Sequence, residues 1–180
     1  ADFIAADLIA QAEHDPDAVS VFVTTSARLG SEVAAAIDMQ LLKLAANNLA
    51  RRSLERNGAI FVAKNVAAAA RFVNLFAPEH LTLSGLDVKQ MLAKIDSAGS
   101  IFLGDWSAQT FGDYASGTNH VLPTGGVART RGGLSVTDFV KCITVQEVSR
   151  SGCARLAPVA AEFAKAEDLV AHGRSVEVRR

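Results

Sequence analysis

Hydrophobic side chains near the start of the chain recur at the spacing of a helix. Residues up to about Glu13 are therefore predicted to form an amphipathic helix, with apolar positions Phe3, Ile4, Leu8 and Ile9. A second stretch, residues 26–56, is rich in Ala, Leu and charged residues and predicts one long helix. Gly58 follows and is expected to end that helix, because glycine is common just after a helical segment.

Three short apolar runs predict buried strands. The first, residues 19–25, is β-branched and apolar, which fits a strand buried on both faces. Residues 59–63 and 99–104 are the second and third runs. Helical stretches separate the runs, and this alternating order favours βαβ units and a parallel sheet. We therefore predict an α/β fold, in which ligands bind at the carboxyl ends of the strands.

Two helices are predicted between the second and third strands. The first follows Asn65, a plausible N-cap, and reaches Phe76, whereas the second covers residues 86–95. A proline ends the first helix, and so Glu79 and His80 are expected in its exit loop.

The pattern changes after the third strand. Residues 105–133 are rich in Gly, Thr, Ser, Asn and Pro, and a stretch of this length indicates a functional loop region. The next segment predicts a short helix and then a strand near residues 142–148. A final amphipathic helix is predicted over residues 151–171, with apolar positions Leu156, Val159, Ala160, Phe163 and Leu169.

Composition narrows the class of protein. The 180 residues are 49% hydrophobic and 21% charged, which is typical of a packed globular core and argues against disorder. The net charge is −1 with no basic stripe, which argues against nucleic acid as a partner. No apolar run is long enough to span a bilayer. Cys142 and Cys153 form no C-x-x-C motif, and we expect two reduced, partly buried thiols in a cytoplasmic protein.

Candidate metal ligands occur in three separated segments. Gln11 and His14 are three residues apart at the end of the first helix, and they could offer an amide oxygen and an imidazole from one face. Asp113 precedes His120 in the Gly-rich segment, and His172 is expected to end the last helix. One Gln, two His and one Asp could form a mixed nitrogen and oxygen site for zinc. Spacing alone does not establish this site, since surface residues give the same pattern.

Glu79 and His80 are adjacent in the sequence APEHL. One interpretation is a solvated helix end with a capping histidine, and the other is an acid/base pair in a pocket. A histidine base suits neutral pH because its free pKa is about 6.5. Neighbouring side chains in an extended segment point different ways, so one could face a substrate while the other handles water.

Several motifs together resemble the histidinol dehydrogenase family. They are QAEH at 11–14, APEHL at 77–81, GSIFLG at 99–104, GDY and NHVLPT within 112–124, LSVTDFVK at 134–141, and LAPVAA and AEDLVAHGRSVEVR near the end. Two departures lie in loops: Thr118 stands where the family usually has Pro, and residues 132–133 are Gly-Gly where Ser-Pro is common. Family members are much longer, and the chain resembles their C-terminal half. A fragment, a split subunit or a truncated product is therefore expected.

The resemblance implies oxidation of L-histidinol to L-histidine through histidinal, the last steps of histidine biosynthesis, with NAD and zinc as cofactors. It implies catalysis by Glu79 and His80. The implied zinc ligands are Gln11, His14, Asp113 and His172. The implied substrate-binding residues are Gln11, His14, His80, Asp113, His120, Glu167 and His172.

The resemblance also implies a homodimer, in which Glu167 and His172 act across the subunit interface. Residues 1–133 would be the second half of a large, Rossmann-like α/β domain, with a partial parallel sheet, flanking helices and the zinc and catalytic site. Residues 134–180 would be a helical dimerisation segment that packs on the partner subunit. Most of the NAD site would lie outside this chain, which by itself should be inactive. Two other interpretations stay open: a non-catalytic metal- or ligand-binding module derived from that enzyme, and a zinc hydrolase with Glu79 as general base.

Overall fold

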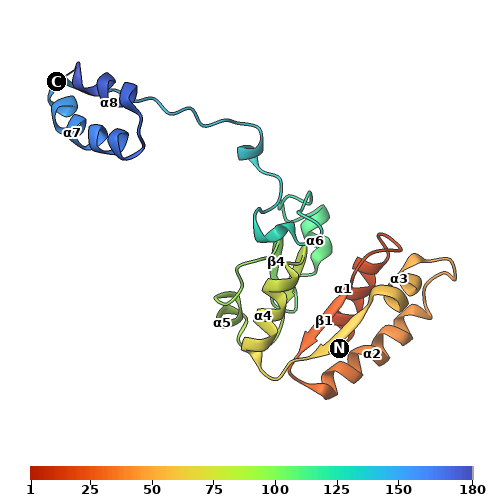
Figure 1. Ribbon diagram of the computed structural model, residues 1–180. Coiled ribbons are helices and arrows are strands. Elements are labelled where there is room, and N and C mark those ends of the chain that lie inside the picture. The colour runs from red at the N-terminus through yellow and green to blue at the C-terminus, as the bar shows by residue number, and fades with distance from the viewer. Residues whose placement is uncertain (180) are drawn as a thin grey trace. The chain divides into compact units, whose positions relative to one another are not determined.

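The computed structural model describes residues 1–179 and divides the chain into two units (Figure 1). The first unit is Ala1–Asp138 and the second begins at Phe139, whereas the predicted boundary lay between residues 133 and 134. The first unit combines helices with short parallel strands, and the described part of the second contains helices and an extended segment. The mixed α/β class, with short parallel sheets and flanking helices, is thus confirmed.

Three helices pack together at the start of the first unit. They are α1 (Asp2–Ala12), α2 (Ala27–Leu41) and α3 (Leu49–Asn57). The buried side chains of this core are Ile9, Ala12, Leu41 and Ala50, with Ile37, Leu44 and Leu54 packed against them. The helix predicted up to about Glu13 is confirmed, and its apolar residue Ile9 is part of this core.

Residues 26–56 form two helices rather than the single long helix predicted. Asn48 begins α3, because its side-chain oxygen accepts a hydrogen bond of 2.8 Å from the Ala50 amide. The Asn48 side-chain amide also donates to Glu13 Oε2, at 3.1 Å, which links this turn to the end of α1. A helical pattern of apolar and charged residues does not by itself reveal such a cap.

The strands form two separate pairs rather than one sheet of three strands. The first pair consists of β1 (Val21–Thr24) and β2 (Ala59–Val62), and the second of β3 (His80–Leu83) and β4 (Ser100–Leu103). Both pairs are parallel; Val21 lies opposite Ala59, and His80 lies opposite Ser100. Parallel pairing of this kind needs a crossover connection, and the intervening helices supply it.

Helix α4 (Val66–Phe76) agrees with the helix predicted after Asn65. The Asn65 side-chain oxygen accepts a hydrogen bond of 2.9 Å from the Ala68 amide and so caps the helix. The helix ends at Ala77, which has left-handed backbone angles, φ 52° and ψ 66°. This reversal turns the chain toward the second strand pair one residue before the proline.

His80 lies at the start of β3 and not in an exit loop, as the sequence had suggested. The four-residue strand was not predicted, because a proline and two charged side chains stand at its beginning. Its backbone is extended because it pairs with β4. The strand therefore exists through a tertiary contact, and this contact determines the direction of the His80 side chain.

Residues 105–133 contain more regular structure than the predicted loop. Helix α6 (Gln109–Tyr114) and the 3-10 helix η1 (Val127–Arg129) lie within this stretch, and η2 (Val136–Asp138) follows it. The helix predicted over residues 86–95 is shorter, because α5 covers only Val88–Leu92.

The second unit contains two helices where one was predicted over residues 151–171. They are α7 (Arg150–Ala166) and α8 (Val170–Glu177). The break lies at Asp168, whose φ of 58° is left-handed and cannot continue a helix. His172 consequently lies in the first turn of α8. The prediction that it ends the last helix is wrong.

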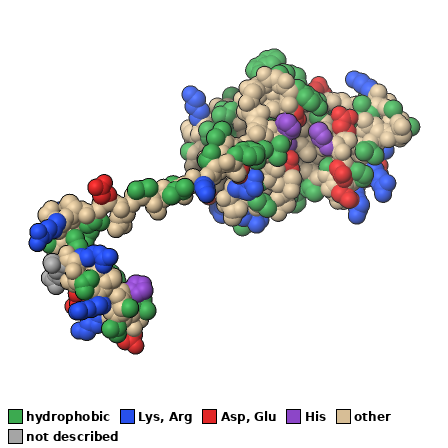
Figure 2. Space-filling model, turned by 90° about the horizontal axis from the view of Figure 1, so that it is seen from above, with side chains coloured by type: hydrophobic (Ala, Val, Ile, Leu, Met, Phe, Trp, Pro, Cys, Tyr) green, Lys and Arg blue, Asp and Glu red, His purple; other side chains and the backbone are tan. Residues whose placement is uncertain are grey.

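The strand predicted near residues 142–148 is not formed. The segment has no regular structure and no strand partner in the described part of the chain. The hydrophobic side chains of residues 139–148 are exposed, and green side chains lie along this extended stretch in Figure 2; they are Phe139, Val140, Ile143, Val145 and Val148. Cys142 is exposed rather than partly buried, whereas Cys153 is half-buried, and both thiols are free.

None of the helices within residues 1–179 has the length and apolar character that a membrane span needs.

Candidate active site

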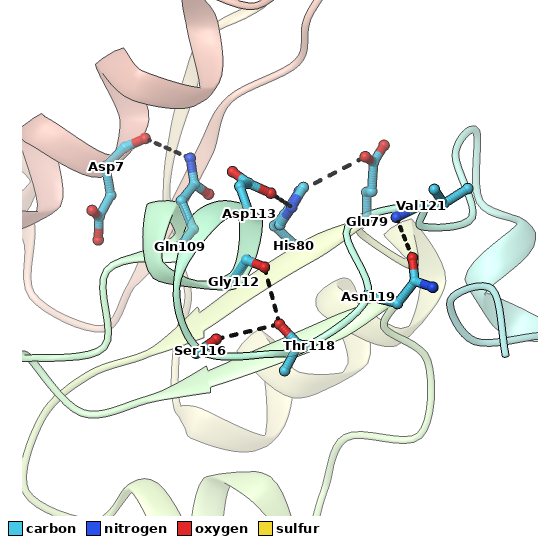
Figure 3. Close-up of polar contacts among 10 residues, drawn as sticks. All are labelled: Asp7, Glu79, His80, Gln109, Gly112, Asp113, Ser116, Thr118, Asn119 and Val121. Carbon is cyan, nitrogen blue, oxygen red and sulfur yellow. Dashed lines mark hydrogen bonds and ion pairs between the residues drawn. The ribbon is translucent and has the colours of Figure 1, made fainter.

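His80 lies between two carboxylates (Figure 3). Its Nε2 atom is 3.8 Å from Asp113 Oδ1, and its Nδ1 atom is 3.9 Å from Glu79 Oε1. Both distances exceed those of hydrogen bonds. The side chains are only 12% exposed for His80, 21% for Asp113 and 33% for Glu79. An imidazole held this close to two carboxylates is a group suited to proton transfer.

Two buried polar atoms lack a hydrogen-bond partner in the described residues. They are His80 Nδ1 and Gln11 Oε1. An unsatisfied buried polar group costs about 1–3 kcal/mol, and such groups are therefore rare. Both atoms belong to residues that the sequence assigned to substrate or metal. Their lack of partners within the chain fits groups that bind a ligand from outside it.

The backbone before His80 is tied closely to β4. The Gly99 amide donates to Pro78 O and the Ser100 amide to Glu79 O, both at 2.9 Å. A Cβ atom at Gly99 would lie 2.6 Å from Glu79 O and 3.0 Å from Pro123 Cδ. Only glycine permits this close approach, and it holds Glu79 at the beginning of β3.

Gly99→Ala is expected to destabilise the first unit by about 1–3 kcal/mol, because the added methyl group meets backbone that cannot move aside cheaply. Urea unfolding of the wild-type and variant chains would measure this difference. Gly132→Ala is the matched control, since nothing lies within 4 Å of a Cβ atom there and its φ is not positive. Equal stability of the two variants would contradict the close approach.

Asp113 is brought to His80 by helix α6. Gly112 packs on the ring of Phe102, where a Cβ atom would lie 2.8 Å from two ring carbons. The same ring stacks on His80, with centroids 6.0 Å apart and an angle of 22° between the planes. The Thr118 hydroxyl donates to Gly112 O at 3.2 Å. A proline at position 118 could not make this bond, so the departure noted in the sequence supports α6.

Helix α1 carries Gln11 and ends just before His14. Gln11 is half-buried, and His14 is exposed. On the same helix, burial raises the pKa of the Asp7 carboxyl above its ordinary value. The main-chain oxygen of Asp7 accepts a hydrogen bond of 3.2 Å from Gln109 Nε2, and Gln109 is the first residue of α6. Figure 3 shows Gln109 and Asp113 on this short helix, with Asp7 beside them.

The remaining predicted site residues are His120 in the first unit, and Glu167 and His172 in the second. His120 is exposed, and within residues 1–179 it makes no hydrogen bond or ion pair with Glu79, His80 or Asp113. Glu167 directly follows α7 and His172 lies in the first turn of α8, and both belong to the second unit. The described residues contain no group of three His, Cys, Asp or Glu side chains that could hold a metal.

Sequence reasoning missed the residues that build the site around His80. Phe102, Gln109 and Gly112 were not singled out, although each positions His80 or Asp113. One signal was available: Gly112 directly precedes Asp113, and glycine inside a helix often marks close packing. The role of Gln109 depends on a contact across 102 positions in the sequence and left no local signal.

The family model and the known proteins described here, which match nearly the whole chain, belong to one family. The family model described as "Histidinol dehydrogenase" matches residues 1–180. A histidinol dehydrogenase from Vibrio vulnificus (strain YJ016) is 46% identical over 179 residues, which are 99% of this chain and 41% of that relative. The histidinol dehydrogenase of Geobacter metallireducens (strain ATCC 53774 / DSM 7210 / GS-15) is 48% identical over 176 residues, 98% of this chain and 40% of the relative.

A solved structure agrees with these relatives. The crystal structure of histidinol dehydrogenase from Elizabethkingia anophelis superposes with a TM-score of 0.91 and is 40% identical in sequence. The match covers 99% of this chain and 41% of the crystallised chain. The chain thus spans about two fifths of the length of the proteins it matches.

Proposed function

Because this chain belongs to the histidinol dehydrogenase family, we propose that the protein containing it oxidises L-histidinol to L-histidine through histidinal, in histidine biosynthesis. The observation that carries the proposal is the position of His80 between Glu79 and Asp113, with a buried and unpaired Nδ1 atom. Such a ring is suited to take a proton from an alcohol. NAD would accept the hydride in each oxidation.

His80 is the proposed base for the alcohol step. Its strand holds the backbone, and Phe102 holds one face of the ring, so the imidazole has little freedom to turn. Asp113 lies on the Nε2 side and stabilises the ring when it carries a second proton. The proton leaves the substrate hydroxyl as the hydride leaves the adjacent carbon, which gives the aldehyde.

Glu79 is the proposed base for the aldehyde step. It precedes His80 by one residue and is the more exposed of the two side chains, at 33% against 12%. Water can therefore reach it. Removal of a proton from that water lets its oxygen add to the aldehyde, and loss of a second hydride then gives the carboxylate of histidine.

The donor set fits a zinc ion. Gln11, His14, Asp113 and His172 would hold it, and zinc bound there would hold the imidazole and amino nitrogens of the substrate in place. The observation that favours this set is the buried and unpaired Gln11 Oε1 atom. Gln11 would contribute an amide oxygen, and His172 belongs to the second unit. The proposed set is therefore not a group of three His, Cys, Asp or Glu side chains within one unit.

The two alternative interpretations have less support. A non-catalytic module would not need a buried imidazole with carboxylates near both nitrogen atoms. A zinc hydrolase would use Glu79 as its general base, but such a mechanism assigns no role to His80. Activity assays distinguish all three: NAD-dependent oxidation of histidinol, hydrolysis of an ester or amide, or neither.

Activity is expected only from the whole protein. The chain covers 41% of the Vibrio vulnificus relative, and we propose that the rest carries most of the NAD site. Positioning of the reactants is a large part of catalysis, with effective molarities of about 10⁵–10⁸ M. The 180 residues alone should therefore form no NADH from histidinol, with or without zinc. Formation of NADH at the rate of the whole protein would overturn this division of the site.

The second unit is the proposed dimerisation segment, with Glu167 and His172 reaching the partner's active site. Helix α7 has a row of apolar side chains on one face that are largely exposed; they are Leu156, Val159 and Phe163, at 57%, 56% and 67%. Exposed apolar faces mark interfaces in proteins. A second copy of the chain would cover this one.

Phe163→Asp is expected to weaken dimerisation of the whole protein by about 2 kcal/mol or more, since buried aromatic anchors dominate interfaces. Light scattering over a concentration series measures the dimer fraction. Ala154→Asp is the matched control, because Ala154 is exposed on the opposite side of α7. A wild-type protein that is monomeric and active would contradict the shared site.

A further inference from the structure

Gln109 joins the two helices that carry proposed zinc ligands of the first unit. Its side chain is buried, at 7% exposure for the residue, and Nε2 donates to the main-chain oxygen of Asp7 at 3.2 Å. Buried amide groups are costly unless paired, so this bond has a defined geometry. It is a contact between α6 and α1, which are far apart in the sequence.

The two residues joined by this bond, Asp7 and Gln109, each lie one helical turn before a proposed zinc ligand. In an α-helix the amide of residue i donates to the carbonyl of residue i−4. Helical spacing therefore places Asp7 one turn before Gln11 on α1, and Gln109 one turn before Asp113 on α6. One side chain thus connects the turn that ends at Gln11 with the turn that ends at Asp113.

We propose that Gln109 is a positioning residue for the metal site, and that its amide sets the separation between Gln11 and Asp113. The inference rests on the proposed function, which makes both residues zinc ligands. Gln109 itself touches neither metal nor substrate. Helix α6 is only six residues long, and so this bond to α1 is a main restraint on its position.

A second glutamine provides a matched control. Gln40, on α2, donates from Nε2 to the main-chain oxygen of Asp2 at 3.0 Å. This bond is also made by an amide side chain to a carbonyl of α1, but α2 carries no proposed ligand. Replacing either glutamine by methionine keeps the length of the side chain and removes the donor.

The experiment compares Gln109→Met and Gln40→Met in the whole protein. Zinc affinity is measured by competition with a chromophoric chelator, and the thermal midpoint is measured for the metal-free protein. Gln109→Met is expected to weaken zinc binding by about 10–100-fold, the usual effect of losing a group that orients metal ligands. Gln40→Met removes a solvent-exposed bond, so it should lower the thermal midpoint less and leave zinc affinity unchanged.

Three outcomes would overturn the proposal. Gln109→Met could bind zinc with wild-type affinity, or both variants could lose the same zinc affinity. The third outcome is that Gln40→Met folds while Gln109→Met and Gln109→Leu do not. The last would make Gln109 a residue of the fold as a whole. If the wild-type protein binds no zinc, the proposed function fails instead. If it binds zinc and the Gln109 variants bind it equally well, only the positioning role fails.

Discussion

In the whole enzyme, His80→Asn is expected to lower turnover with histidinol by about 10²–10⁴-fold, the usual contribution of a general base. Asparagine is smaller than histidine and cannot take the hydroxyl proton. The Nδ1 and Nε2 atoms, each facing a carboxylate at 3.9 Å and 3.8 Å, would both be lost. Turnover is measured by NADH formation with saturating histidinol and zinc.

The thermal midpoint and zinc content of His80→Asn separate catalysis from stability. His80 is half-buried and stacks on Phe102, so a small loss of stability is expected. A fall in turnover that is no larger than the fall in folded protein would mean that His80 only fills space beside β4. A pH profile that keeps the acidic limb of the wild type would also contradict the role as base.

Glu79→Gln is expected to act chiefly on the second oxidation, with a loss of about 10²–10⁴-fold when histidinal is the substrate. Glutamine has nearly the same shape but cannot remove a proton from water. Water can reach the Glu79 carboxylate because this side chain is partly exposed. Turnover is measured separately with histidinol and histidinal.

The matched control for this variant is Glu55→Gln, which changes an exposed carboxylate of α3 in the same way. The turnover of Glu55→Gln should equal that of the wild type with both substrates. Equal and small losses for His80→Asn and Glu79→Gln with both substrates would make the pair structural. The helix-end interpretation of APEHL would then be the correct one.

The position of His80 on β3 changes how the pair works. In a loop, the backbone of Glu79 and His80 could rotate, and the directions of their side chains would not be fixed. On β3, the pairing of His80 with Ser100 and the bond from the Ser100 amide to Glu79 O hold the two backbones in place. Glu79 directly precedes the strand, and its Oε1 atom lies 3.9 Å from His80 Nδ1, so the two groups are held beside each other.

The local elements of the first unit could be predicted because their causes are local. Asn65 caps α4 through a bond to Ala68, three residues away, and Gly58 follows α3. The apolar runs of β1, β2 and β4 predicted strands correctly, although most of their side chains are half-buried or exposed rather than buried as expected. The family motifs gave the candidate residues Glu79, His80 and Asp113 for the same reason: each is a short, contiguous pattern.

The prediction of one long helix over residues 26–56 was wrong because the pattern overlooked the cap at Asn48, whose side chain accepts a hydrogen bond from the Ala50 amide and begins α3. A tertiary contact accompanies this cap, since Asn48 also donates to Glu13 across 35 positions. The final helix broke at Asp168, where a left-handed residue turns the chain so that α8 returns along α7. An amphipathic pattern continues through such a turn, because both helices present apolar side chains.

The sequence by itself determined the α/β class and most element positions, and its motifs singled out Glu79, His80 and Asp113 as candidate site residues. Each follows from residue type, from spacing along one element, or from a motif. Only the tertiary structure decided that His80 begins a strand, that Asp113 faces its Nε2 atom, and that Gln109 connects α6 to α1. These features depend on distances between residues far apart in the chain, and the energy of such contacts exists only once the elements have packed together.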